Sequence, residues 1–86
     1  HALDRNDEAL DDVEMLLATQ ERLFGAQHPS ALQTAALRSR ILHALGRRED
    51  ALVEAKRLLP LHASSFGDDH RETIVLSGFV RALEAA

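Results

Sequence analysis

Apolar residues recur at every third or fourth position along four segments of the chain, which is the spacing of a helix that buries one face. One segment ends near residue 24, two span residues 29–45 and 48–66, and the last begins after residue 69. The second segment is apolar around more than half of its girth, which is typical of a helix packed between two neighbours. The pattern predicts an all-α chain of about four helices in antiparallel pairs.

The start of the chain matches the end of the second predicted helix, since residues 1–3 repeat the His-Ala-Leu of residues 43–45. We therefore expect residues 1–3 to be the tail of a helix that is mostly missing, and the chain to be a fragment of a longer polypeptide. Asn6 or Asp7 then caps the first full helix. The apolar stripe of that helix comprises Ala9, Leu10, Val13, Leu16, Leu17 and Phe24.

Two corners between helices share the frame Phe-Gly-x-x-His, which begins at Phe24 and again at Phe66. At the first corner, Gly25 supplies the left-handed conformation that commonly ends a helix. Gln27 or His28 caps the next helix, and Pro29 occupies its first position, where a missing N–H group does no harm. The frame predicts a tight turn at both places. We call two residues counterparts when the offset from Phe24 to Phe66 relates them.

Pro60 lies inside the third predicted helix, where a proline removes one backbone hydrogen bond. We predict a kink in a continuous helix, and the alternative is a helix that ends near Leu59 with an irregular tail. The fourth helix begins after Asp69, and Glu72 three residues later completes a capping-box-like arrangement. This helix carries apolar residues around much of its circumference, at Ile74, Val75, Phe79, Val80 and Leu83.

Composition narrows the class of protein. The 86 residues are 45% hydrophobic with no Trp or Tyr, and their formal net charge of -4 lacks the basic excess of a nucleic-acid footprint. No apolar run approaches the roughly 20 residues that span a bilayer, so we expect no membrane partner. The chain has no Cys, which rules out disulfides and thiolate metal sites and favours a cytoplasmic location.

Few side chains suggest chemistry. His28 and His70 invite a metal site together with nearby acids and His62, but they occupy equivalent corners and we interpret them as helix caps. The serines lack the glycine elbow or ordered base of a nucleophile. We expect no enzyme activity, no catalytic or metal site and no cofactor.

Charged residues are unevenly distributed along the chain. Acids gather in the first segment and arginines in the middle, and these groups are either complementary faces of a head-to-tail assembly or simply solvated faces. The groups comprise Asp7, Glu8, Asp11, Asp12 and Glu14 on one side, and Arg38, Arg40, Arg47 and Arg48 on the other.

The corner at residues 24–29, Phe-Gly-x-x-His-Pro, and the turn at residues 45–52, Leu-Gly-Arg-x-x-x-Ala-Leu, resemble tetratricopeptide repeats of the kinesin-light-chain type over the whole chain. The resemblance implies 42-residue units of two antiparallel helices, stacked as an α-solenoid. It divides the chain into the end of one unit (1–24), a complete unit (25–66) and the first helix of the next unit (67–86). Arg38, Arg71 and Arg81 depart from the family pattern.

The resemblance also implies a function. Such units are common in multidomain bacterial regulators and signalling ATPases, where they bind proteins or self-associate and carry out no chemistry. We expect a scaffold module whose concave helical face binds a segment of another protein. On the family pattern, the partner-binding residues are Gln33, Leu37, Arg40 and His43 in the second helix and Val75 and Phe79 in the fourth.

Two further expectations concern assembly. The rival to partner binding is a structural or regulatory arm of a nucleotide-driven signalling or transcription regulator, which contacts only its own chain or self-associates. Stacked repeats bury their apolar faces against neighbouring repeats, and about three are normally needed. We therefore predict that the isolated chain forms a homodimer through its fourth helix, in which each copy supplies the neighbour that the other lacks.

Overall fold

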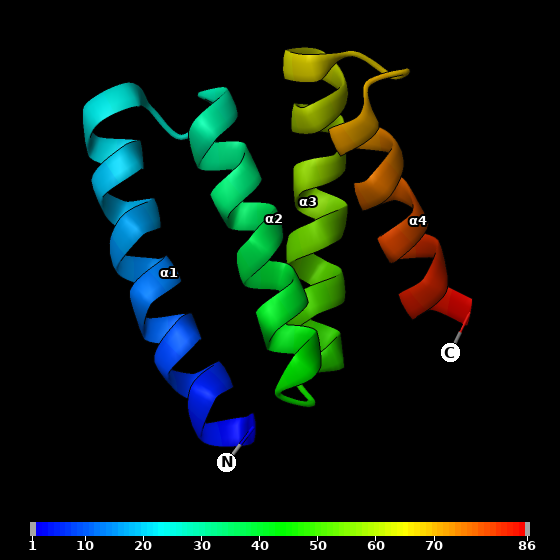
Figure 1. The fold of residues 1–86 in the computed structure, drawn as a ribbon. Helices are drawn as coiled ribbons and strands as arrows, with labels where there is room; N and C mark the ends of the chain where they lie inside the picture. The colour runs from blue at the N-terminus through cyan, green and yellow to red at the C-terminus, as the bar shows by residue number, and fades with distance from the viewer. Residues whose placement is uncertain (1, 86) are drawn as a thin grey trace.

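The computed structural model describes residues 2–85, and their side chains from residue 5 onward. It contains four α-helices, α1 (Ala2–Phe24), α2 (Pro29–Ala44), α3 (Arg48–Phe66) and α4 (Arg71–Ala85), and no strand within the described residues. The helices lie in a row in sequence order, each antiparallel to the one before it (Figure 1). Extensive packing joins α1 to α2, α2 to α3 and α3 to α4. The predicted all-α arrangement of antiparallel helices is confirmed.

The first helix differs from its predicted form. It runs without a break from Ala2, so neither Asn6 nor Asp7 caps it and residues 2 and 3 are not the tail of an earlier helix. The counterpart of Gly46 in this helix is Asp4. Gly46 has a φ of +83° at the turn after α2, a conformation that side chains other than Gly rarely adopt. The helix continues because no such residue interrupts it.

The two Phe-Gly-x-x-His corners are built in the same way. Gly25 and Gly67 have φ values of +95° and +100°, as the sequence predicts for these turns. The Nδ1 atom of His28 accepts a hydrogen bond from the Ser30 backbone N–H at 3.1 Å, and His70 accepts one from Glu72 at 3.0 Å. Both histidines are therefore helix caps, as predicted, and the second cap is His70 rather than Asp69.

An aromatic stack completes each corner. The ring centroids of Phe24 and His28 lie 4.8 Å apart, and those of Phe66 and His70 lie 4.9 Å apart. Each stack joins the end of one helix to the residue that caps the next. The capping nitrogen is thus held in place by the preceding helix as well as by its own backbone.

Helix α3 passes through Pro60 and ends at Phe66. The alternative of a helix that ends near Leu59 with an irregular tail is wrong. The residues after Pro60 stay helical because they pack on their neighbours: His62 is buried, and Leu61 and Phe66 contact the core. The kink at Pro60 remains a prediction.

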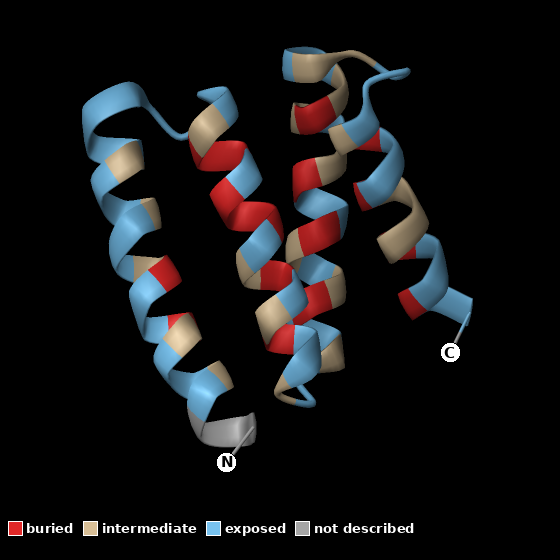
Figure 2. Cartoon of the chain, in the orientation of Figure 1, coloured by how far each residue is buried: buried red, intermediate tan, exposed pale blue. Residues whose placement is uncertain are grey.

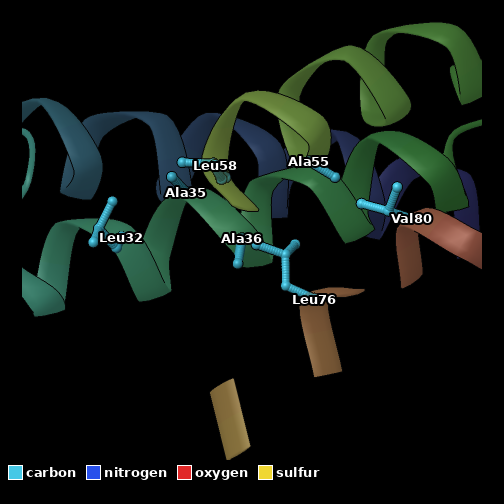
Figure 3. Packing of buried hydrophobic residues seen from close by; sticks show 7 residues of the cluster. All are labelled: Leu32, Ala35, Ala36, Ala55, Leu58, Leu76 and Val80. Carbon is cyan, nitrogen blue, oxygen red and sulfur yellow. The ribbon is translucent and has the colours of Figure 1, made fainter. Parts of the chain in front are cut away.

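The buried residues form two adjoining clusters along the facing sides of the helices (Figure 2). Figure 3 shows the first cluster, which brings α2, α3 and α4 together; its members are Leu32, Ala35, Ala36, Ala55, Leu58, Leu76 and Val80. The second cluster joins residues of all four helices; its members are Leu10, Val13, Leu42, Ala51 and Leu83. Both clusters combine branched side chains with alanines, which lets the helices pack closely without aromatic residues at their centres.

Helix α4 is less exposed than its sequence suggests. Val80 and Leu83 are buried in the two clusters, and Phe79 is half-buried against them. Only Ile74 and Val75 remain as exposed large apolar side chains of this helix. The expectation that these apolar residues lack a neighbour within the chain is therefore wrong for Val80 and Leu83, which pack in the core.

Candidate partner-binding surface

Four of the six predicted partner-binding residues gather where α2 faces α4. Arg40, Val75 and Phe79 line one hollow, and the ring of His43 lies edge-on to Phe79 with centroids 5.8 Å apart. Arg40 and His43 come from neighbouring turns of α2, and Val75 and Phe79 from neighbouring turns of α4. We call this set the α2–α4 face.

The hollow of the α2–α4 face is shallow. Its floor is formed by Ala36 and Leu76, which are buried, while Arg40 and Val75 at its edge are exposed. Its volume is about 10 Å³, which is no more than the space that a single water needs. A surface of this shape offers contact to an extended or helical segment and encloses no small molecule.

The other two predicted residues lie elsewhere on α2. Leu37 is 43% exposed and lines a separate apolar groove with Val13 and Leu16 of α1 and with Ile41. Gln33 is exposed one turn before Leu37. Because Leu37 and Arg40 are three residues apart, they are neighbours on the helix surface, and the groove adjoins the α2–α4 face.

The predicted arginine cluster is not one surface. Arg38 donates from Nε to Glu14 at 2.8 Å and from Nη1 to Glu54 at 2.7 Å, so it links α1, α2 and α3. Arg47 forms an ion pair with Asp50, and Arg48 donates to the backbone carbonyl of Leu83. Of the four arginines, these three are used within the chain.

Arg40 differs from the other three. Within residues 5–85 it forms no ion pair, and its guanidinium stands exposed at the edge of the hollow beside Glu72. An arginine with unused donors next to apolar side chains suits a partner that presents carboxylate or carbonyl groups. Arg40 is therefore the polar feature of the α2–α4 face.

The bridging role of Arg38 was missed at the sequence level. Its signal is a charged residue in the row of a packed helix where the family pattern has an apolar one. Glu14 and Glu54 are the matching acids, one in each flanking helix. The side chains of Arg38 and Glu54 are only 23% and 16% exposed, so the pair is partly shielded from solvent.

His62 lies buried in the core. Its Nδ1 atom is 3.2 Å from the Leu58 carbonyl, and its Nε2 atom has no hydrogen-bond partner among the described residues. Burial lowers the pKa of His62 below its usual 6.5, against the Leu58 carbonyl and the Glu72 charge, which both raise the pKa. Across the described side chains, no three His, Asp or Glu residues are grouped as metal ligands.

Part of the helical repeat also matches a known family. Residues 1–30 match the family model of the tetratricopeptide repeat. The match covers α1, the first corner and the start of α2, and it supports a tetratricopeptide repeat in this part of the chain. Repeats of this family generally mediate protein–protein interactions and are typically non-catalytic.

No curated protein and no solved structure matches the chain. Among the described helices, none combines the length and the apolar character that crossing a bilayer requires.

Proposed function

We propose that the chain is a non-catalytic tetratricopeptide-repeat scaffold that binds a segment of another protein on its α2–α4 face. The observation that carries this proposal is Arg40, an arginine without an ion pair in the described chain, beside the exposed Val75 and the half-buried Phe79. This combination favours a segment that alternates acidic and apolar side chains. Gln33, Leu37 and His43 extend the contact along α2.

The proposed division of the chain follows the kinesin-light-chain pattern of 42-residue units. Residues 1–24 end one unit, residues 25–66 form a complete unit, and residues 67–86 begin the next. The two corners support this division, since they repeat the same glycine conformation, the same histidine cap and the same aromatic stack.

A displayed library of short random peptides, selected against the chain, tests the proposal. Selected peptides are expected to carry Asp or Glu next to Leu, Ile or Phe, and to shift the NMR signals of Arg40, His43 and Val75. Arg40→Glu and Val75→Glu should each weaken binding at least tenfold, about 1.4 kcal/mol. Arg22→Glu, at an exposed arginine of α1 that forms no ion pair within residues 5–85, is the matched control. Binding that survives both face variants would rule out the assignment.

The second candidate is a structural or regulatory arm of a larger switch protein that contacts its own chain or self-associates. The exposed apolar residues at the two ends of the helix row, Leu16 on α1 and Ile74 on α4, support it. The predicted homodimer through α4 has a narrower basis, because Val80 and Leu83 are buried within one chain. Peptide selection that returns no binder, with self-association in solution, would favour this candidate.

A further inference from the structure

The two rows of α2 that pack on its neighbours can be told apart by comparison with α4. Helix α4 packs extensively only on α3, and its buried residues are Thr73, Leu76, Val80 and Leu83. Their counterparts form the row 31, 34, 38 and 41 of α2. From this row Arg38 reaches Glu14 in α1 as well as Glu54 in α3, and Ile41 lines the groove beside α1. This row therefore faces the preceding helix in both cases.

The other row of α2 faces the helix that follows it. Its members are at most 3% exposed under α3, and they are Leu32, Ala35, Ser39 and Leu42. No described helix covers their counterparts in α4: Ile74 is 55% exposed, Ser77 is half-buried, and Arg81 and Glu84 are exposed. The first three line the groove between α3 and α4. We call these four residues of α4 the tail face.

Helix α1 has the opposite gap. In α3, the counterpart of α1, the residues Ala51, Leu58 and His62 are each at most 1% exposed. Two other residues of α3, Leu59 and Ala63, line the groove beside α4. The residues of α1 that correspond to the buried three are Ala9, Leu16 and Gln20. Leu16 is 50% exposed, and no described helix precedes α1 to cover it. We call the side of α1 that carries these residues the head face.

We propose that the tail face of one copy packs on the head face of the next copy, as α2 packs on α3 within the chain. The two faces lie at opposite ends of the helix row, so one molecule presents both at once (Figure 1). The apolar centre of the contact is Ile74 against Leu16. Their counterparts Leu32 and Leu58 share one buried cluster.

The register of α2 and α3 places opposite charges together across this contact. Leu42 and Ala51 belong to one cluster of these antiparallel helices, so Ser39, one turn earlier, lies opposite Glu54, one turn later. The counterparts of this pair are Arg81 of one copy and Asp12 of the next.

A second pair has the reverse polarity. Leu42 and Arg47 line the same hollow between α2 and α3. Their counterparts are Glu84 on the tail face and Arg5 beside the head face. Both are exposed, and Glu84 also pairs with Lys56 of its own chain at 3.3 Å. Two opposite-charge pairs of opposite direction define the register in which a tail face meets a head face.

A contact between two different faces does not close on itself in a pair. Each added copy presents a new tail face, so the assembly grows beyond two copies, as an open row or a larger ring. This distinguishes the proposal from a two-fold dimer through α4, in which α4 of one copy meets α4 of the other and α1 takes no part.

Sedimentation equilibrium of the whole chain at low salt, from micromolar to millimolar concentration, tests the proposal. The mean mass should rise without levelling at a dimer. Arg81→Glu and Asp12→Arg should each weaken association roughly tenfold or more, because each places like charges together. Arg71→Glu and Asp11→Arg are matched controls, since both residues are exposed and lie outside the two faces. Circular dichroism checks that every variant stays helical.

The decisive experiment mixes the two face variants. Each variant should associate only weakly alone. In a mixture, a contact between the two variants joins either the two substituted side chains, whose charges are exchanged, or the original Arg81 and Asp12. The mixture should therefore recover the mean assembly mass that the unmodified chain shows.

Three outcomes would overturn the proposal. The first is a monomer throughout the concentration range. The second is loss of association with Arg81→Glu but not with Asp12→Arg, which would favour the two-fold dimer. The third is a mixture of the two variants that fails to restore association.

Discussion

The helix pairs α1–α2 and α3–α4 are joined by corners of the same chemistry, but they differ in the neighbouring helices that cover them. In the first pair, α2 is packed on both sides and its long rows of Leu and Ala are buried. In the second pair, α4 is packed on one side, and in its other row Ser77 and Glu84 replace Ala35 and Leu42 while Ile74 stays apolar. The corners fix where helices turn, whereas the neighbours decide which residues form the core. The comparison can be tested by exchanging counterpart positions.

The largest effect is expected at the apolar centres of these rows. Leu32→Ala removes a fully buried side chain and should lower the free energy of unfolding by about 2 to 5 kcal/mol. Ile74→Ala, its counterpart, should change it by about 0.5 kcal/mol or less, since Ile74 is largely exposed. Urea denaturation followed by circular dichroism measures both. Equal effects would show that α4 is covered as α2 is.

Arg38→Val gives α2 the residue that α4 has at the counterpart position, which is Val80. It removes the cation that joins Glu14 to Glu54 and leaves Glu54 only the exposed Arg57, which should destabilise the chain by about 1 to 3 kcal/mol. The control Arg57→Ala removes an exposed partner of Glu54 and should cost under about 1 kcal/mol. Similar losses in both variants would contradict a structural role for the Arg38 bridge.

Gly78→Ala introduces the residue that α2 has at the corresponding position, Ala36. A side chain at residue 78 meets no atom within 4 Å, and Gly is a poor residue in a helix interior. The variant should therefore raise the free energy of unfolding by about 0.5 to 1 kcal/mol, seen as a higher melting temperature. In Gly46→Ala the same change should destabilise, since φ is +83° there.

His62→Gln exchanges the buried histidine for its counterpart Gln20, and the pH-dependent part of its effect appears in acidic solution. Because burial lowers the pKa of His62, the unfolded chain binds the proton more readily, so stability is complete above pH 6.5 and declines as the pH falls below it. The decline in melting temperature between about pH 7.5 and about pH 5 should be shallower in the variant. An unchanged slope would assign the acid sensitivity to other groups.

The features predictable from the sequence are those fixed by neighbouring residues. Gly25 and Gly67 end helices, and His28 and His70 cap the next ones, because these effects act within one turn. The start of α1 was not predicted, since the repeat suggested a turn where Asp4 replaces the glycine that a turn requires.

What remained unpredictable depends on contacts between helices. The burial of Val80 and Leu83 follows from how α3 lies on α4, and the Arg38 bridge follows from where Glu14 and Glu54 meet α2. For the candidate surface, the family pattern predicted Arg40, His43, Val75 and Phe79, and these four side chains lie together in the structure. It did not anticipate that Leu37 faces a separate groove beside α1.

The packing of each helix mainly on its sequence neighbours bears on how the chain folds. Among the described helices, extensive contacts join only those adjacent in the sequence, and contacts of this local kind favour rapid folding. The end helices α1 and α4 each pack extensively on a single neighbour. Their amide hydrogens should therefore exchange first, while those of α2 and α3 exchange last, when these two helices open together.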